Sequence, residues 1–316
     1  MDLGDSRAVV TGGGGFVGSH LAERLLEADA TVSVVDDLSN GRAEWVPEAA
    51  SFLEGDLTEM RTVERAIDED TDVVFHLAAR KNVDDPNPRS QFEENTTMTM
   101  NVLERMAEVG VSNLVFTSSS TVYGEAPRPT PEDYPPFPIS TYGAAKTAEE
   151  ALISASVHDS ALSAWVFRFA NVVGPRLQAG AVIVDFIDKL LADPTELTIK
   201  GNGRQEKSYL WIEDCLDGML SVVSSTDSGH HVFNLGTRTT TSVLRIADVV
   251  SEVMGLDPSY TFTGGERGWS GDVPRMRLSI EKLQPMGWEP RHASDEAVRM
   301  AATALYERRR GGESNI

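Results

Sequence analysis

The stretch AVVTGGGGFVGSHLAERLLEADATVSVVDD, residues 8–37, decides the fold of this chain. It reads as an apolar strand, a glycine-rich turn, an amphipathic helix, a second apolar strand and a pair of acidic residues. Gly12, Gly15 and Gly18 have the spacing G-x-x-G-x-x-G. In a strand–turn–helix unit such glycines allow a sharp turn, close approach of a diphosphate to the backbone, and tight packing of helix on sheet. This order of elements predicts a dinucleotide-binding βαβ unit rather than a flexible glycine-rich loop.

Asp36 ends the second strand of this unit. A carboxylate at that place accepts hydrogen bonds from the two hydroxyls of a ribose and repels a 2′-phosphate. The helix that follows the glycines offers free backbone N–H groups and the positive end of its dipole to a diphosphate. We therefore predict that the chain binds NAD in preference to NADP.

The composition is that of an ordinary globular protein, with 316 residues of which 41% are hydrophobic and 24% charged. A formal net charge of −21 argues against nucleic acid and anionic membranes as partners. The sequence has neither a basic leader nor a membrane-length apolar run, so we expect a cytoplasmic protein. Its single cysteine excludes an internal disulfide framework, and its histidines lack ligand spacing, so no metal site is expected. The acidic surplus fits either a high-salt habitat or a GC-rich genome.

Strand and helix patterns alternate through the first half of the chain. This alternation predicts an α/β fold, a Rossmann-type doubly wound parallel sheet with ligands at the carboxyl ends of its strands. Beyond Asn171 the alternation weakens, which indicates a smaller C-terminal α+β lobe. We expect an NAD-binding domain over residues 1–171, with the segment of about 208–238 returning to it. The remaining residues, 172–207 and 239–316, are expected to bind the substrate.

Apolar periodicity places the individual elements. The strands expected after the opening unit cover residues 51–53, 72–77, 113–117, 163–169, 197–200 and 232–235. The expected helices cover residues 59–67, 92–109, 141–158, 182–191, 213–224, 242–254 and 295–309.

Tyr142 and Lys146 stand four residues apart near the start of an expected helix, so their side chains share one face. A phenol has a pKa of about 10 and is a poor base at neutral pH. An adjacent ammonium stabilises the phenolate and lowers that pKa, which makes the tyrosine a usable acid and base. Alone, a Tyr-x-x-x-Lys pair is typical of a solvated helix face. Here it follows a dinucleotide-binding unit and the hydroxyl-rich run at 118–121, and this context favours a catalytic pair.

An ordered series of motifs runs through almost the whole chain. They are TGGGGFVGSH (11–20), DDLSNG (36–41), GDL (55–57), HLAA (76–79), NTTMTMNVLE (95–104), SSSTVYGE (118–125), YGAAK (142–146), RFANVVGP (168–175), GNGRQEKSYLWIED (201–214), FNLG (233–236) and GWSGDVPRMRLS (268–279). Together they resemble the extended short-chain dehydrogenase/reductases, within them the NAD-dependent nucleotide-sugar epimerase/dehydratase family. The similarity is greatest to UDP-glucose/UDP-galactose 4-epimerases of the archaeal type.

This resemblance implies roles for the matching residues. Tyr142 is the acid/base, and Lys146 holds the nicotinamide ribose and tunes Tyr142. Ser119 hydrogen-bonds the sugar, although a match displaced by one residue gives this role to Ser118 or Ser120. The residues implied to contact NAD are Gly12, Gly15, Phe16, Val17, Gly18, Asp36, Asp37, Asn40, Gly41, Asp56, Leu57, Leu77, Ala78, Ala79, Lys81, Asn95, Thr117, Tyr142, Lys146 and Phe169.

Two departures from the family pattern concern the cation that binds the diphosphate. Lys207 stands where many members have arginine, and it offers a charge but not a bidentate fork. Where the pattern has arginine before Pro-Gly-Asp, this chain has WSGD, so we expect Arg267 to bind the phosphate, with Arg275 as the alternative. The residues implied to contact the substrate are Ser119, Thr121, Asn171, Val182, Lys207, Arg267 and Met276.

The residues after Ser119 bear on the reaction. The resemblance implies that hydride leaves C4 of the sugar for NAD while Tyr142 takes the hydroxyl proton. Dehydratases resemble one another in an acidic pair at this place, because chemistry at C5 needs carboxylates, whereas this chain has Ser120 and Thr121. We therefore expect 4-epimerisation of a UDP-sugar through a transient 4-keto intermediate. Alternatives are an epimerase for UDP-N-acetylhexosamines or UDP-uronates, or a dehydratase or reductase. The resemblance also implies a homodimer.

Overall fold

The computed structural model describes residues 1, 3–81, 86–269 and 271–311 of the chain. Packing of the backbone divides it into two compact units. Unit 1 consists of Met1–Val122, Thr141–Arg168 and Met219–Phe233. Unit 2 consists of Tyr123–Ser140, Phe169–Gly218 and Asn234–Ile316.

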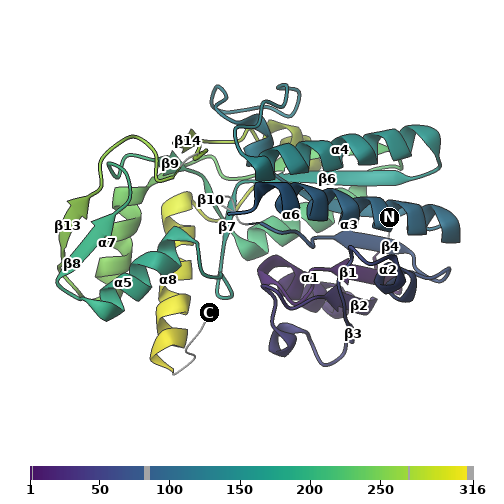
Figure 1. Ribbon diagram of the computed structural model, residues 1–316, viewed down its shortest axis with the longest axis horizontal. Helices are drawn as coiled ribbons and strands as arrows, with labels where there is room; N and C mark the ends of the chain where they lie inside the picture. Colours follow the sequence, from purple (N-terminus) through teal and green to yellow (C-terminus); the bar gives the residue numbers. More distant parts are fainter. Residues whose placement is uncertain (2, 82–85, 270, 312–316) are drawn as a thin grey trace. The chain divides into compact units, whose positions relative to one another are not determined.

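A seven-stranded sheet forms the centre of unit 1. Its strands are β1 (Arg7–Thr11), β2 (Thr31–Asp36), β3 (Ser51–Glu54), β4 (Val73–His76), β5 (Asn113–Ser119), β6 (Ser163–Phe169) and β11 (His230–Leu235). They lie in the order β11-β6-β5-β4-β1-β2-β3 (Figure 1). β1 pairs in parallel with both β2 and β4, so the chain changes direction across the sheet at β1. Ligands bind at such a switch point in open α/β sheets. The predicted Rossmann-type doubly wound sheet is confirmed.

Helices cover this sheet. They are α1 (Phe16–Glu27), α2 (Met60–Ala66), α3 (Pro88–Val109), α4 (Thr141–Asp159) and α6 (Ile212–Ser225), of which the last begins in unit 2. α1 packs on β1 and β2, whereas α3 lies along α4 with α2 beside it. Large apolar side chains fill much of the space between these layers, and burial of each one contributes roughly 1.5–3 kcal/mol. Among those with no exposed surface are Phe75, Phe116 and Phe167.

Two elements near the site differ from their expected bounds. α3 begins at Pro88 rather than at residue 92, because Asn87 caps it by accepting a hydrogen bond from the Ser90 N–H at 3.3 Å. Proline suits the first helical position, where its missing N–H has no partner to lose. β5 continues beyond the expected 113–117 as far as Ser119. The other expected elements differ from the structure by a residue or two at their ends.

In its described residues, unit 2 combines three small sheets with three whole α-helices and the start of α6. Its strands are β7 (Asn171–Val173), β8 (Glu196–Ile199), β9 (Glu206–Lys207), β10 (Tyr209–Trp211), β12 (Thr241–Ser242), β13 (Ser259–Phe262) and β14 (Arg275–Met276). They pair as β10-β7, β12-β9-β14 and β13-β8. Most of them are too short to show a period in the sequence, which explains why only β8 was expected. The helices α5 (Val182–Ala192), α7 (Val243–Met254) and α8 (Ser294–Arg310) pack on one another.

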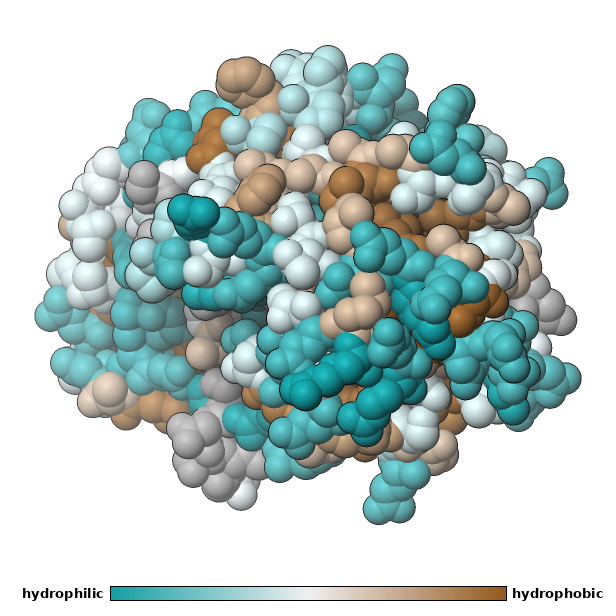
Figure 2. All heavy atoms as spheres, turned by 45° about the vertical axis from the view of Figure 1, so that its right-hand side comes forward, coloured by the Kyte–Doolittle hydropathy of each residue, from teal (hydrophilic) through white to brown (hydrophobic). Residues whose placement is uncertain are grey.

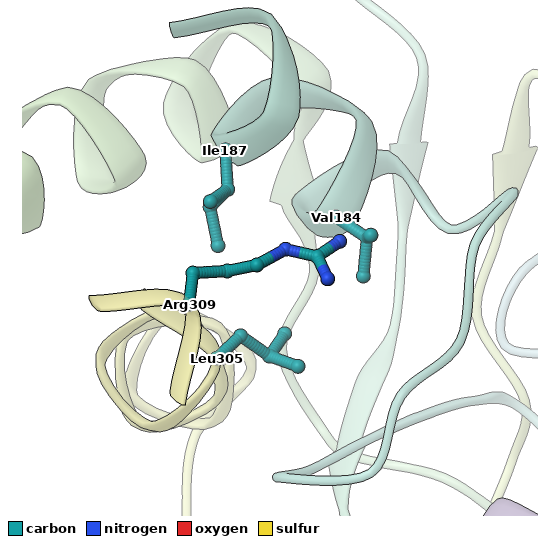
Figure 3. A pocket seen from close by; sticks show the side chains of 4 residues that line it. All are labelled: Val184, Ile187, Leu305 and Arg309. Atoms are coloured by element: carbon teal, nitrogen blue, oxygen red, sulfur yellow. The ribbon is translucent and has the colours of Figure 1, made fainter. Parts of the chain in front are cut away.

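A shallow pocket lies between α5 and α8. It is lined by Val184, Ile187, Leu305 and Arg309, and the Arg309 guanidinium extends between the apolar side chains (Figure 3). This guanidinium forms an ion pair with Asp188 at 2.8 Å. The pocket is thus a packing contact between two helices, covered by an arginine that already has its counter-charge.

Hydrophilic residues spread over much of the face seen in Figure 2, with hydrophobic residues in smaller areas between them. Among the helices of the described segments, none has the length and apolar character needed to cross a membrane. Within the same segments, no group of three or more histidine, cysteine, aspartate or glutamate residues is arranged to hold a metal ion.

Candidate functional site

The glycine turn between β1 and α1 has no room for side chains. Gly12 has φ of +69°, and a Cβ there would lie 2.7 Å from the Ala78 nitrogen. A Cβ on Gly18 would lie 2.2 Å from the Gly12 oxygen. Gly15 is the N-cap of α1, and no side chain caps this helix end. The turn therefore brings bare backbone to a helix N-terminus, which is the cradle that a dinucleotide diphosphate requires.

Asp36 supports this turn from the end of β2. Its Oδ2 accepts the Gly14 N–H at 2.9 Å and its Oδ1 accepts the Leu38 N–H at 2.8 Å. Burial raises the pKa of Asp36, while these two backbone donors act in the opposite direction. A carboxylate has about four acceptor sites, so beyond its backbone donors Asp36 keeps capacity to accept from a ribose hydroxyl. The expected ribose-binding acid thus also braces the glycine turn, which the sequence alone did not show.

The other residues expected to bind the cofactor lie at or near the carboxyl ends of the same strands. Phe16 and Val17 open α1, and Gly41 packs against Asp36, where its Cβ would lie 2.5 Å from Oδ1. Eight of them follow β2, β3 or β4. Four of these are exposed, namely Asp37, Asn40, Asp56 and Lys81. Leu77, Ala78 and Ala79 are half-buried, and Leu57 is buried.

Asn95 lies on α3 with its side chain fully buried. Its Oδ1 accepts the Arg80 N–H at 2.9 Å, and its Nδ2 donates to the Arg80 carbonyl at 3.1 Å and to the Gln91 carbonyl at 2.9 Å. The amide therefore fixes the backbone that follows β4. Its contacts suit a residue that shapes the cofactor-binding edge of the sheet.

The serines at the end of β5 have different partners. Ser118 Oγ donates to Glu150 Oε1 at 2.5 Å, so its hydroxyl proton is committed inside the protein. Ser119 Oγ accepts the Thr121 N–H at 3.2 Å and the Thr121 hydroxyl at 2.9 Å, so its own proton remains available to a ligand. Thr117, two positions before Ser119, is half-buried. Ser118 and Ser120 were the alternatives to Ser119 for the hydrogen bond to the sugar, and the structure disfavours Ser118.

Tyr142 and Lys146 occupy the first two turns of α4. The Lys146 ammonium is buried, 4.5 Å from the centre of the Phe116 ring and 6.0 Å from that of Tyr142. Its carboxylate partner is Glu149, with Nζ and Oε1 3.3 Å apart. Burial, together with the Glu149 charge, raises the pKa of Tyr142. Lys146 is expected to lower this pKa, and burial and the Glu149 charge act in the opposite direction.

Unit 2 brings two of the expected phosphate-binding cations together on one aspartate. Lys207 Nζ lies 2.6 Å from Asp272 Oδ1, and Arg267 Nη1 donates to the Asp272 carbonyl at 2.5 Å. Arg267 also forms an ion pair with Glu125. Arg275, the alternative cation, is exposed on β14.

The remaining residues expected to bind substrate also lie in unit 2. Asn171 opens β7, and Val182 opens α5. Met276, on β14, is 7% exposed and is paired in register with Lys207. Phe169, expected at the nicotinamide, ends β6 and is half-buried. Ser270 of the WSGD segment is outside the described residues.

Several buried polar groups beside these residues were not predicted from the sequence. Glu149 lies seven positions after Tyr142, a helical spacing that would have indicated a shared face. The Glu150–Arg168 ion pair lies behind Ser118, with 2.6 Å between Oε2 and Nη2. Asp272 stands in the segment where only arginines were considered. His76 and Thr99 gave no signal, because their partners lie far away in the sequence.

Comparison with known proteins agrees with this geometry. The model of the NAD dependent epimerase/dehydratase family matches residues 8–236. The chain belongs to that family. Its cofactor is NAD, and the bare glycine turn with its helix N-terminus and Asp36 provides groups that fit it.

Individual relatives cover nearly the whole chain. The UDP-glucose 4-epimerase of Mycolicibacterium smegmatis is 32% identical over 308 residues, which are 92% of this chain and 96% of that protein. A crystal structure of a UDP-galactose 4-epimerase is 40% identical, with a TM-score of 0.87 over 95% of this chain and 99% of the other. The UDP-N-acetylglucosamine 4-epimerase of Methanobrevibacter ruminantium M1, solved with UDP-N-acetylmuramic acid, is 26% identical, with a TM-score of 0.86 over 96% and 99%.

Proposed function

We propose that this chain catalyses the NAD-dependent 4-epimerisation of a UDP-sugar, with UDP-glucose and UDP-galactose as the first pair to test. The observation that carries the proposal is the arrangement in unit 1, where Tyr142 and Lys146 share one face of α4 and Ser119 keeps an uncommitted hydroxyl proton. Unit 1 binds the dinucleotide in this proposal, and unit 2 supplies the residues for the nucleotide sugar.

The protein's own groups move the proton. Bound NAD supplies the chemistry of accepting a hydride from C4 and returning it. Tyr142 takes the proton of the sugar 4-hydroxyl as the ketone forms and gives it back when the ketone is reduced. Ser119 donates a hydrogen bond to the same sugar oxygen. The buried ammonium of Lys146 favours the phenolate of Tyr142 electrostatically.

The kind of side chains after Ser119 favours epimerisation over chemistry at C5, which needs carboxylates. Ser120 and Thr121, which follow Ser119, are not carboxylates. Glu150 lies behind Ser118, but it is 8% exposed and paired with Arg168, which removes it as an acid or base for substrate. After oxidation at C4, the favoured course is therefore rotation of the keto sugar and return of the hydride to its other face.

The sugar is the finer part of the proposal. Similarity to UDP-glucose and UDP-galactose 4-epimerases favours the hexoses. The likeness to a UDP-N-acetylglucosamine 4-epimerase makes UDP-N-acetylhexosamines the second candidate. Met276 has a flexible side chain that fits either sugar.

A resident cofactor gives the first prediction. We expect protein purified without added nucleotide to release about one NAD per chain on denaturation, and to interconvert UDP-sugars without added NAD, since every turnover regenerates it. The measurement is enzymatic assay of the released NAD, followed by a panel of UDP-glucose, UDP-galactose, their N-acetyl forms and UDP-glucuronate. Net formation of NADH without interconversion of any sugar would show a dehydrogenase instead.

The cluster on Asp272 gives the second prediction. We expect Lys207→Gln and Arg267→Gln each to raise the KM for the UDP-sugar about 10- to 100-fold, the range of a lost charge-assisted hydrogen bond. NAD content should be unchanged, because these residues lie in unit 2. Arg275→Gln is the matched comparison, with a change below about twofold. A larger effect at Arg275 than at Arg267 would transfer the phosphate role to Arg275.

A further inference from the structure

Glu149 lies in a buried polar network that the proposed roles leave unused. Its side chain is 0% exposed, and Oε1 is 3.3 Å from the Lys146 ammonium. Thr99 Oγ1 of α3 donates to the same oxygen at 2.8 Å. Across the described segments, Oε2 has no hydrogen-bond partner. A buried carboxylate with one bare oxygen costs stability. Such a group beside a catalytic lysine therefore points to a function.

The hydrogen bonds of this network have one consistent direction. Because Thr99 donates its proton to Glu149, it accepts one from His76 Nε2, 3.1 Å away. His76 is then the neutral tautomer whose Nδ1 accepts the Thr11 hydroxyl at 2.7 Å. Burial and the Lys146 ammonium lower the pKa of His76 to about 3, in agreement with a neutral ring. Glu149 therefore ends the network as an acceptor, from Thr99 on one side and from Lys146 on the other.

We infer that Glu149 is a positioning residue for the reaction: it anchors the Lys146 ammonium and offsets part of its positive charge, and so sets the pH at which Tyr142 gives and takes a proton. This inference rests on the proposed function, in which Tyr142 is the acid/base.

The charges around Glu149 are few. α4 presents the Lys146 ammonium and the Glu150 carboxylate, which has its own buried counter-charge. α3 and β4 present the neutral groups Thr99 and His76. Burial raises the pKa of Glu149, and Lys146 acts in the opposite direction. The Lys146–Glu149 pair is thus the local source of charge. Neutralising the carboxylate leaves a net positive charge at this pair.

The direction of the effect follows from the sign of the charge. The Glu149 carboxylate, in addition to burial, raises the pKa of Tyr142. Glu149 acts on Tyr142 through the charge of its ion pair with Lys146, which the Thr99 hydroxyl also stabilises. Removing that charge leaves Lys146 unopposed and favours the phenolate, so the proton is lost at lower pH.

The test is Glu149→Gln in the NAD-loaded protein. We expect the limb of the kcat–pH profile that reports Tyr142 to move to lower pH by on the order of one unit, as expected for one charge about two helical turns away. We also expect the Kd of NAD to rise roughly 3- to 10-fold, because the ammonium loses its anchor. Glu104→Gln on the exposed side of α3 is the matched control, and it should leave both quantities unchanged.

A limb that stays at the wild-type position in folded Glu149→Gln protein would overturn the inference. If that variant does not fold, Glu149→Asp tests the inference instead. Aspartate keeps the negative charge, but its shorter side chain does not reach the Lys146 ammonium. We therefore expect weaker retention of NAD, with the Tyr142 limb of the kcat–pH profile at its wild-type position. Wild-type retention by Glu149→Asp would contradict the anchoring role. Failure of the proposed function shows differently, as absence of sugar interconversion by the wild type, and NAD retention tests the anchor even then.

Discussion

Replacing Tyr142 by phenylalanine is expected to lower kcat about 10²- to 10⁴-fold, the usual contribution of a positioned acid/base group. The ring remains, so the packing at the start of α4 is preserved, and only the proton-carrying oxygen is lost. NAD content should equal that of the wild type, because the glycine turn and Asp36 are untouched. The measurement combines steady-state turnover of the best UDP-sugar with the amount of NAD released on denaturation.

A control for this variant is Tyr306→Phe on α8, which removes a phenol oxygen of unit 2 and is expected to leave kcat unchanged. Wild-type turnover by Tyr142→Phe would remove this tyrosine from the mechanism. Loss of turnover together with loss of NAD would instead assign it a part in holding the cofactor.

The second large effect is on stability. Glu150→Gln is expected to lower the free energy of unfolding by about 3–5 kcal/mol, because it removes the Glu150 charge from a buried ion pair with the Arg168 guanidinium. Arg168 is 5% exposed and Glu150 8% exposed, and Nη2 and Oε2 are 2.6 Å apart. The hydroxyl of Ser118 loses its charged acceptor in the same variant. Urea denaturation followed by circular dichroism measures the change.

Glu289→Gln provides the matched comparison, since it breaks an ion pair with Arg238 whose side chains are 53% and 59% exposed. Solvent screens such a pair, so its loss should change stability by less than about 1 kcal/mol. Equal effects of the two substitutions would show that burial of the Arg168–Glu150 pair is energetically unimportant.

The parts of the fold that the sequence predicts best are those with strong local patterns. The glycine turn and the apolar strands around it predict the sheet, because both the strand pattern and the turn residues lie within a few positions of one another in the sequence. The start of α3 was also available from the sequence, since Asn87 and Pro88 form a cap and a first helical position. Strands of unit 2 such as β9 and β14 could not be predicted, because their pairing depends on segments far apart in the chain.

The candidate site divides in the same way. Tyr142 and Lys146 follow from helical spacing and resemblance, and their roles stay predictions until tested. The environment that sets their ionisation does not follow from spacing, because the fold alone brings His76 to Thr99 and Thr99 to Glu149. The causes that raise the pKa of Tyr142 were therefore not foreseen from the sequence. Burial and one neighbouring carboxylate decide it.

The extension of β5 to Ser119 has a consequence for how such a protein can change in evolution. Successive side chains of a strand leave opposite faces, and Ser118 is held by Glu150 whereas Ser119 is not. Which serine can face the substrate therefore depends on whether its position in the strand is odd or even. Inserting or deleting one residue within β5 would exchange the two hydroxyls, and the serine that we propose to bind substrate would then face Glu150. A substitution within β5 keeps this register, whereas a change of its length by one residue does not.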